Sequence, residues 1–554
     1  QAPAHTRLHG SAAMAPGAVM AAAEELSAEE AREVLIRAGL DQASMKGKGG
    51  FYTVVGVAAF ASLGGMLFGL DIGYIAGVKS MLSFQRDVLH GKKITDGQDS
   101  LITMIFGLGA AISAFPPIIS LLVDRLGRKG SVISGGVVFC VGAIMQGVAW
   151  EINLMMIGRL IAGLSVGLLS ANVPVYQSEI APPTHRGMLV SVYQLALTIG
   201  IMIAFLLALA LEKVEEPIGG WRLVILVQVV PGAALVFGGL LMGESPRWLV
   251  QKGRPKEALK TLVAVRSPKD DVQSELAGIV AENQHEQAMG DPSWSEFLSG
   301  RNLWLLSVGV LLQLIQQVCG MNVYMYDGPT IFEEIFHSKH AGRLFTAVSG
   351  AVNVFSTLPA IFFIDKAGRM VLLRISALGM AICSAVLATV GTVCFPEHGD
   401  TNAAIRNGTA PNATAAAVAE QPCGDWAKWT ATVAICAFIF NFGYGWGPVV
   451  WTYCAEMFPL KYRTKAVGAT TDANWVGNVF IAFAPPLLIG AIGFNTFWIF
   501  VGVNILGFFV ACKLPETKDK SLEEVQRTFD LWLGGNVEDS SDSEGSSESS
   551  KGSD

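Results

Sequence analysis

A group of uncharged amide side chains lies within apolar stretches of the chain, where it could bind a hydroxylated ligand. Gln316 and Gln317 are adjacent, and Asn322 follows in the same stretch. On one helix, Gln316 and Asn322 would occupy neighbouring faces. An amide donates and accepts hydrogen bonds at once, and a tryptophan ring can cover the apolar face of a ring-shaped polyol. The other candidates for such a site are Gln194, Asn353, Trp451 and Trp475, with Asn474 and Asn478 as weaker ones.

These amides should face the interior of a helical bundle, because contact with lipid would be costly. The alternative is that they only join helices, with hydrogen bonds worth about 0.6–2 kcal/mol each. That alternative explains one or two amides, but explains less well why so many share stretches with tryptophans. A polyol site is therefore the favoured interpretation.

Asp71 and Arg159 are the charged residues deep inside apolar stretches of the first half of the chain. An unpaired ion in a membrane is expensive, so the two are expected to pair with each other. An acid beside a fixed arginine tends to stay ionised. The pair could exchange protons only if some step separated it.

A tandem repeat indicates how these residues are positioned. Asp124-Arg125-Leu126-Gly127-Arg128 returns 241 residues later as Asp365-Lys366-Ala367-Gly368-Arg369. The pair Glu179 and Arg186 returns 277 residues later as Glu456 and Arg463, and Glu244 is matched by Glu516. Each cluster follows a long apolar run, so the chain contains two similar membrane-spanning halves. Duplicated halves with one site at their interface are typical of secondary transporters.

Composition supports a membrane protein: hydrophobic residues are 51% of 554, charged residues are 15%, and the mean hydropathy is +0.46. We predict an all-α protein of twelve transmembrane helices in two six-helix halves. The expected regions are an N-terminal segment 1–50 with a helix at 21–42, the halves 51–242 and 303–512, a helical linker 243–302 and an acidic disordered tail 513–554. Twelve runs long enough to cross the hydrocarbon core start near Phe51, Leu101, Gly130, Asn153, Met188, Trp221, Leu303, Phe345, Val371, Trp429, Gly468 and Phe494.

Basic residues cluster in the loops after spans 2, 4, 8 and 10, which places these loops, the linker and both termini in the cytosol. No removable signal peptide is recognised at the start of the chain. The two repeat offsets differ, so the second half has an insertion, which must be the 394–428 loop on the outer side. This loop contains glycosylation sequons at Asn407 and Asn412. Cys394 and Cys423 lie on the oxidising side, and the sequence leaves their pairing open.

The repeated acids and arginines are expected to gate the pathway. A role in fixing the membrane orientation explains the basic residues, but it does not explain the acids that recur beside them. We predict charge pairs between the two halves that close and open during transport, as a two-state gate requires. The residues assigned to this gate are Asp124, Arg128, Glu179, Arg186, Glu244, Asp365, Arg369, Glu456, Arg463 and Glu516.

From about Phe51 to Gln526 the chain resembles the sugar porter family of the major facilitator superfamily, and most of all eukaryotic hexose transporters. The resemblance lies in the order and spacing of GRLIAGLSVGLLSANVPVYQSEIAPPTHRG, DRLGRK, GESPRWL, QQVCGMN, DKAGRM, WGPVVW…EMFP…R and PETK. It implies that Gln194, Gln316, Gln317, Asn322, Asn353, Trp451 and Trp475 contact sugar. It also implies that Asp71 and Arg159 match the pair that takes up the proton in proton-coupled members. Two departures are Met370, where a basic residue is usual, and Asp327, where a second tyrosine is common.

The expected function is therefore transport of a hexose, D-glucose or a related monosaccharide, across the plasma membrane by alternating access. Facilitative uniport is slightly favoured over proton symport through Asp71. A sugar sensor is less favoured, because the tail is short, and a channel is disfavoured because the repeats match carriers. Polyols and disaccharides stay open as substrates. No ATP-binding loop, metal-ligand cluster or nucleophile–base group indicates an enzyme, a metal or a cofactor. A functional monomer in the bilayer is expected, without a nucleic-acid partner.

Overall fold

The computed structural model describes residues 46–79, 81–92, 94–182, 186–211, 214, 219–289, 293–395, 423–458, 462–518 and 522–533. The predicted helix at 21–42, both sequons and most of the acidic tail lie outside these residues. The described chain is helical, and its only β-type pairing is an isolated bridge between Lys46 and Asp271.

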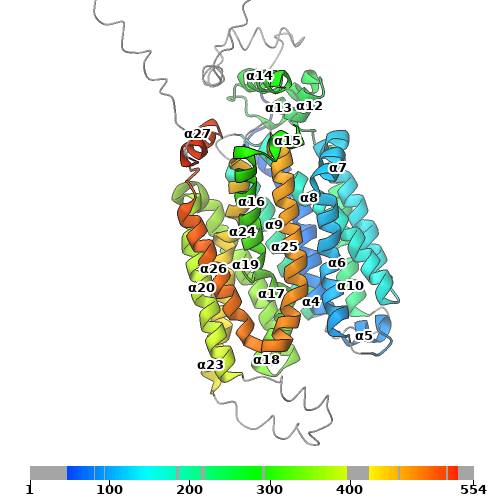
Figure 1. Ribbon diagram of the computed structural model, residues 1–554. Coiled ribbons are helices and arrows are strands. Elements are labelled where there is room, and N and C mark those ends of the chain that lie inside the picture. Colours follow the sequence, from blue (N-terminus) through cyan, green and yellow to red (C-terminus); the bar gives the residue numbers. More distant parts are fainter. Residues whose placement is uncertain are drawn as a thin grey trace, which may run out of the picture.

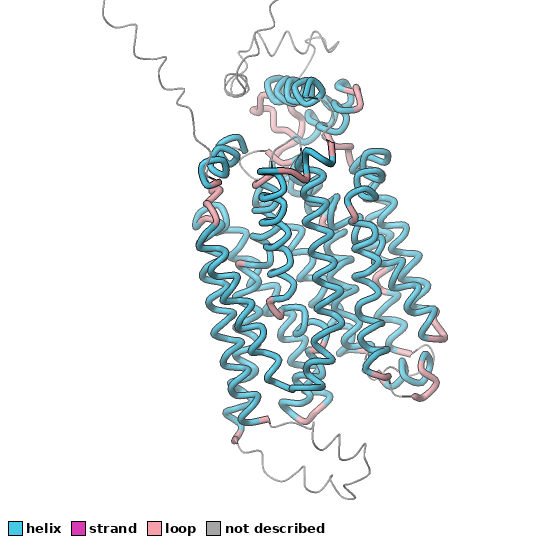
Figure 2. Tube along the Cα trace, viewed as in Figure 1, coloured by secondary structure: helices cyan, strands magenta, loops and turns pink. Residues whose placement is uncertain are grey.

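Long helices run side by side through the molecule and form a bundle, as Figures 1 and 2 show. One end of the bundle carries the linker helices, and we call it the linker end. The opposite end carries the short helices α5 and α18 and the start of α23, and we call it the loop end (Figure 1).

The first half begins with α3 and ends with α11. Its helices are α3 (Phe51–Ala61), α4 (Leu63–Lys79), α5 (Leu82–Val88), α6 (Asp96–Ala114), α7 (Pro116–Gly147), α8 (Ile152–Ile180), α9 (Arg186–Ala210), α10 (Gly220–Leu226) and α11 (Val229–Leu241). The linker contains α12 (Pro246–Gln251), α13 (Pro255–Val265), α14 (Val272–Met289) and α15 (Trp294–Phe297).

The second half repeats this arrangement and is followed by the short helix α27, so the prediction of disorder from residue 513 onward is wrong for this part of the tail. Its elements are α16 (Gly300–Val318), α17 (Met321–Tyr326), α18 (Gly328–Phe336), α19 (Lys339–Ala367), α20 (Arg369–Cys394), α23 (Asp425–Tyr444), α24 (Trp446–Glu456), α25 (Arg463–Ile492), η3 (Gly493–Asn495), α26 (Thr496–Lys513) and α27 (Leu522–Trp532).

The helices support the predicted twelve-span fold. Within the described residues, ten stretches are long and apolar enough to cross a membrane. One of them, Lys465–Lys513, contains most of α25 and all of α26, which are the last two predicted spans. The apolar helix α6 precedes α7 and completes the second span. Helix α7 contains the end of span 2 and all of span 3. The two are separated at Gly127, where a φ of 75° turns the chain.

Glycines let helices of one half touch at their backbones. A Cβ atom added to Gly163 on α8 would lie 2.1 Å from the carbonyl oxygen of Phe106 on α6. On α6, a Cβ added to Gly109 would lie 2.3 Å from the carbonyl oxygen of Leu160. Small residues at such crossings are typical of membrane helices, which gain stability mainly from close packing. The helices α6 and α8 are therefore locked together.

The two halves meet mainly along two helix pairs, α6 with α25 and α9 with α19, and smaller contacts join α24 to α9 and α17 to α4. The linker is attached to both halves. Arg266 is buried, is held by Glu275, and donates from Nη1 to the carbonyl oxygen of Ile180 at the end of α8, at 2.8 Å. The ring of Phe297 stacks on that of Tyr462 just before α25, with the ring centres 5.8 Å apart.

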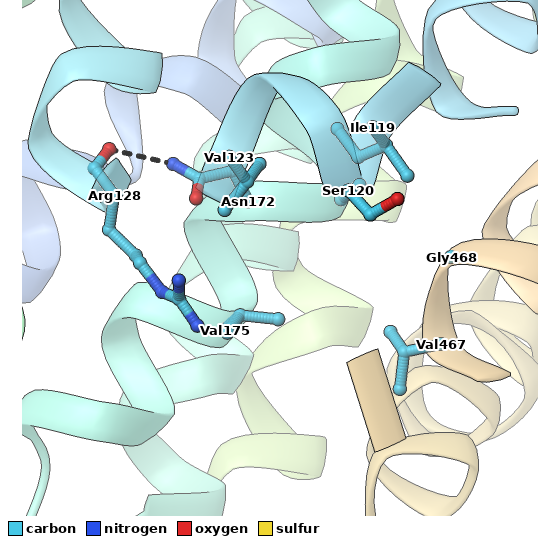
Figure 3. A pocket seen from close by; sticks show the side chains of 9 residues that line it. Ile119, Ser120, Val123, Arg128, Asn172, Val175, Val467 and Gly468 are labelled. Carbon is cyan, nitrogen blue, oxygen red and sulfur yellow. Dashed lines mark hydrogen bonds between the residues drawn. The ribbon is translucent and has the colours of Figure 1, made fainter. Parts of the chain in front are cut away.

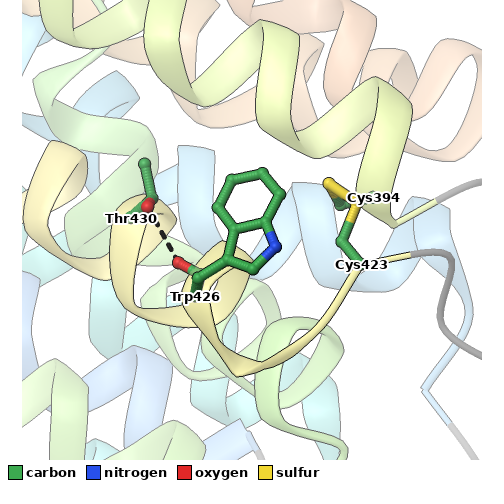
Figure 4. The surroundings of a disulfide bond; sticks show 4 residues. All are labelled: Cys394, Cys423, Trp426 and Thr430. Atoms are coloured by element: carbon green, nitrogen blue, oxygen red, sulfur yellow. Dashed lines mark hydrogen bonds between the residues drawn. A yellow bond between two sulfur atoms is a disulfide. The ribbon is translucent and has the colours of Figure 1, made fainter.

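Cys394 and Cys423 form a disulfide bond, which answers the question that the sequence left open. Their Cα atoms are 5.3 Å apart, and the bond joins the end of α20 to the residues just before α23 (Figure 4). It closes the base of the inserted loop at the loop end of the bundle. The predicted glycosylation of Asn407 or Asn412 stays a prediction.

Candidate functional site

A network of amides joins α16 and α17 to α25 in the centre of the second half. Asn474 donates from Nδ2 to the Oε1 atoms of Gln313 and Gln316, at 2.6 Å each. Gln317 donates to Asn474 Oδ1 at 2.8 Å, and its own Oε1 accepts from Asn322 and from Asn478. Gln316 and Gln317 are buried, as their expected position inside the bundle requires. Each amide has polar partners that a polyol could replace.

The prediction that Gln316 and Asn322 share one regular helix is wrong. The span breaks at Gly320, whose φ is 108°, so α16 ends at Val318 and α17 begins at Met321. The break leaves Asn322 within hydrogen-bonding reach of Gln317. A glycine two residues before an amide was the available signal, since such a φ favours glycine.

Two further members of the network were not predicted. Gln313 accepts from Asn474, and Tyr326 donates from its hydroxyl to Asn478 Oδ1 at 3.2 Å. Gln313 is one helical turn before Gln316 and Gln317, so its spacing was a usable signal. Nothing in the sequence alone distinguished Tyr326 from the other tyrosines.

Trp475 connects the amide network of the second half to residues of the first half. It is fully buried, and its Nε1 donates to Ser170 Oγ on α8 at 3.0 Å. Its ring lies 4.7 Å from that of Phe68 on α4 and 6.0 Å from that of Phe106 on α6, measured between centres. An aromatic surface of both halves therefore adjoins the amides.

The remaining predicted site residues lie on α9, α19 and α24, on the other side of the interface between the halves. Asn353 lies on α19, is buried, and its Oδ1 has no hydrogen-bond partner in the described residues. Gln194 on α9 and Trp451 on α24 are both half-buried. Because α9 packs against both α19 and α24, these side chains border the same interface.

Asp71 and Arg159 pair as expected. Arg159 Nη1 lies 3.3 Å from Asp71 Oδ2, and neither side chain is exposed. The arginine has other partners, since it donates from Nε to the carbonyl oxygen of Ile102 at 2.6 Å and from Nη1 to the hydroxyl of Tyr74. No hydrogen bond of regular geometry reaches the Asp71 oxygens from the described residues, but the side chains of Tyr74 and Gln146 also act on this carboxylate.

The ion pair lies one aromatic ring away from the amide site. The guanidinium carbon of Arg159 is 5.4 Å from the centre of the Phe106 ring, a distance at which a cation is attracted to a ring face. Phe106 in turn packs edge-on against Trp475. A displacement of Arg159 can therefore displace the Phe106 ring and, through it, the Trp475 ring.

The prediction that charge pairs of the gate join the two halves is wrong for the described side chains. Arg128 binds Glu179 at 2.9 Å within the first half, and Arg369 binds Glu456 at 2.8 Å within the second. Each half contains both partners of its own pair, so each pair can form whatever the other half does. Asp124 is exposed, and the side chains of Arg186, Asp365 and Arg463 lie outside the description.

Glu244 and Glu516 act as helix caps rather than as members of ion pairs between the halves. Glu244 accepts from the backbone N–H groups of Arg128 and Lys129 at 3.0 and 3.1 Å, just after the turn at Gly127. Glu516 accepts from the N–H groups of Arg369 and Met370 at 2.9 Å each, at the start of α20. A carboxylate at a helix start is favourable. Burial raises the pKa of Glu244, and the N–H groups oppose that rise.

At the linker end a pocket lies between the halves, directly beside the Arg128 pair. Arg128, Asn172 and Ser120 of the first half face Val467 and Gly468 of α25 across it (Figure 3). Asn172 donates to the carbonyl oxygen of Arg128 at 2.9 Å. The halves also touch beside this pocket, since a Cβ atom added to Gly468 would lie 3.3 Å from Ile119 Cγ2.

We expect Glu179→Gln to lower the thermal stability of the purified protein by about 3 kcal/mol. The substitution leaves the Arg128 charge without its partner in a site that is almost closed to water. Thermal unfolding in detergent measures the change. Glu257→Gln, which removes the acid of an exposed ion pair with Arg254, is the control and should have no measurable effect. Equal melting temperatures for all three proteins would contradict the prediction.

The chain is similar in sequence to known sugar transporters. Residues 57–529 match the family described as Sugar (and other) transporter. The chain is 32% identical to Sugar transport protein MST3 of Oryza sativa subsp. japonica, with 86% of this chain and 89% of the relative covered. It is 32% identical to the Galactose-proton symporter of Escherichia coli strain K12, with 85% and 94% covered. It is also 32% identical to the Probable glucose transporter rco-3 of Neurospora crassa, with 86% and 79% covered.

A solved structure has the same fold. The proton:xylose symporter XylE bound to 6-bromo-6-deoxy-D-glucose superimposes with a TM-score of 0.70 at 24% identity, over 87% of this chain and 99% of that one. The fold is thus the two-half, twelve-helix fold of major facilitators. The match to the family covers most of the chain and concerns transporters rather than enzymes. This chain therefore belongs to the sugar porter family of the major facilitator superfamily, and it is a sugar transporter.

Proposed function

We propose that this sugar transporter carries a hexose, such as D-glucose or a related monosaccharide, by alternating access and together with a proton. The observation that carries the proposal is the amide network beside Trp475, at the interface of the two halves. Amides match the ring hydroxyls of a sugar, and the indole matches its apolar face. Hydrogen bonds between amides can be exchanged for bonds to a sugar and formed again afterwards, which suits a site that must also release its ligand.

The surroundings of Asp71 favour proton coupling over the uniport that the sequence slightly favoured. The Asp71 carboxylate has a single charge contact, whereas Arg159 keeps Ile102 and Tyr74 as partners if that contact breaks. Asp71 can therefore take up a proton without leaving Arg159 unpartnered. Relatives named as a galactose-proton symporter and a proton:xylose symporter are consistent with this choice.

Facilitative uniport is the second candidate. The Asp71–Arg159 pair is closed to solvent on both sides, which favours a permanently ionised, structural pair. In that case Asp71 would stabilise the half without exchanging protons.

For its setting, we propose a monomer in the plasma membrane with the linker end and both termini in the cytosol. The loop end, with the Cys394–Cys423 disulfide, would then be extracellular, where disulfides persist. Glycosylation of Asn407 or Asn412 would lie on that side. A sugar sensor remains the less favoured role.

Uptake of labelled hexose tests the proposal. We expect a host without its own hexose carriers to take up labelled D-glucose when it produces this protein, and to accumulate a non-metabolised analogue above the outside concentration. A proton uncoupler should abolish the accumulation, and sugar addition should make the medium more alkaline. Uptake that only equilibrates would establish uniport, and no uptake of any hexose would reject the substrate class.

A further inference from the structure

Two further buried polar side chains, Tyr74 and Gln146, adjoin the Asp71–Arg159 pair. Tyr74 lies on α4, about one turn after Asp71, and Gln146 lies near the end of α7. All four side chains are closed to solvent. Arg159 donates from Nη1 to the Tyr74 hydroxyl, and that hydroxyl donates to Gln146 Oε1. Polar groups of α4, α7 and α8 therefore form one chain of contacts around the ion pair.

Tyr74 and Asp71 compete for one nitrogen atom of Arg159. The same Nη1 that donates to the Tyr74 hydroxyl lies 3.3 Å from Asp71 Oδ2. Residues three positions apart on a helix are neighbours on its surface, so the hydroxyl of Tyr74 can also reach the carboxylate of Asp71. Whether Tyr74 opposes or supports the ionised carboxylate then depends on where the phenolic hydrogen points.

Gln146 determines the direction of that hydrogen. A phenol has one hydrogen to donate, and here it goes to Gln146 Oε1. Tyr74 therefore offers Arg159 a lone pair and cannot donate to Asp71 at the same time. A Cβ atom added to Gly158 on α8 would lie 2.6 Å from Gln146 Cγ, so close packing against α8 holds the glutamine in this position.

We propose that Tyr74, held by Gln146, is a positioning residue that makes Asp71 the exchangeable partner of the guanidinium and so allows the coupled proton to bind. This inference rests on the proposed symport of hexose and a proton, and it deepens that proposal. When a proton from the medium binds, an O–H bond forms at Asp71 and its contact with Arg159 weakens. The guanidinium then stays on the Tyr74 hydroxyl and on the carbonyl oxygen of Ile102. Release of the proton on the other side of the membrane reverses these changes.

The other titratable side chains that act on this pair are tyrosines. Tyr74 lies on α4 itself, and Tyr326 acts on Arg159 from α17, which packs against α4. A phenol keeps its proton near neutral pH, so neither tyrosine changes its charge in a transport assay. The helices α6 and α7 contribute a backbone carbonyl oxygen and the Gln146 amide, which are uncharged. A pH dependence that arises at this cluster therefore belongs to Asp71.

The test measures the initial rate of hexose uptake against external pH, at a fixed internal pH and per amount of protein in the membrane. Gln146→Met keeps the Cγ methylene that packs on Gly158 but removes the acceptor, so the phenolic hydrogen can turn to Asp71 and stabilise its carboxylate. The external pH of half-maximal uptake should fall by about one unit, as expected for one hydrogen bond to a charged group. Gln177→Met removes another buried amide of the same half, which is bonded to the end of α3, and should leave this pH unchanged.

A second variant shows whether Gln146 acts through Tyr74. Tyr74→Phe should also lower the pH of half-maximal uptake, because Arg159 then has no hydroxyl to stay on when Asp71 is protonated. The double variant Gln146→Met with Tyr74→Phe should have the same pH of half-maximal uptake as Tyr74→Phe alone, whereas an independent effect of packing would add to it.

An unchanged pH of half-maximal uptake in either single variant, or two effects that add, would overturn the inference. If the wild type still accumulates hexose in that case, the proposed symport stands. If the wild type takes up hexose without accumulating it, the proposed coupling itself fails and the inference fails with it.

Discussion

Asp71→Asn is expected to abolish accumulation of sugar while leaving exchange of sugar across the membrane. The amide cannot take up and release a proton, yet Arg159 keeps the carbonyl oxygen of Ile102 and the hydroxyl of Tyr74 as partners. The protein should therefore fold. The ratio of inside to outside sugar should fall to about one, and labelled sugar should still exchange against unlabelled sugar, at a rate that is lower because Arg159 has lost its counter-ion.

The measurement is accumulation of a non-metabolised hexose together with counterflow in the same vesicles. Asp472→Asn is a matched control, since Asp472 is also an acid within a membrane helix and has no part in the proposed coupling. Its accumulation ratio should equal that of the wild type. Continued uphill transport in Asp71→Asn would exclude Asp71 as the proton-carrying group.

The second large effect is expected at the centre of the amide network. Gln317→Ala removes a side chain that bonds to Asn474, Asn322 and Asn478. Hydrogen bonds of this kind contribute about 0.5–1.5 kcal/mol each, so the half-saturating hexose concentration should rise roughly tenfold. Gln316→Ala and Trp451→Leu should act in the same direction.

Uptake kinetics, corrected for the amount of protein in the membrane, measure this change. Gln228→Ala is the control, because Gln228 is a buried amide between α10 and α11 whose side chain has no partner among the described residues. It should leave the half-saturating concentration unchanged. If Gln317→Ala transports like the wild type, the sugar must bind elsewhere.

The features predicted from sequence were those that depend on composition and on repetition. Two apolar halves and an Asp71–Arg159 pair follow from the cost of exposing polar groups to lipid, and the structure has both. The amides were predicted as a group for the same reason. Their actual partners depend on the helix break at Gly320, which regular helical spacing cannot anticipate.

The charge pairs were wrongly predicted to join the two halves because both members of each pair are duplicated. Arg128 and Glu179 recur together as Arg369 and Glu456. When the acid and the arginine of a pair are both duplicated, each half contains a complete ion pair. Contact between charged residues of the two halves is then unnecessary.

The backbone contacts between α6 and α8 also determine how the first half can move. With Gly109 and Gly163 pressed against neighbouring carbonyl oxygens, there is no side-chain layer between the two helices that could slide or compress. When α6 shifts, α8 must then shift with it. The two helices form one rigid unit, and a small rotation of this unit displaces its two ends by more than its centre.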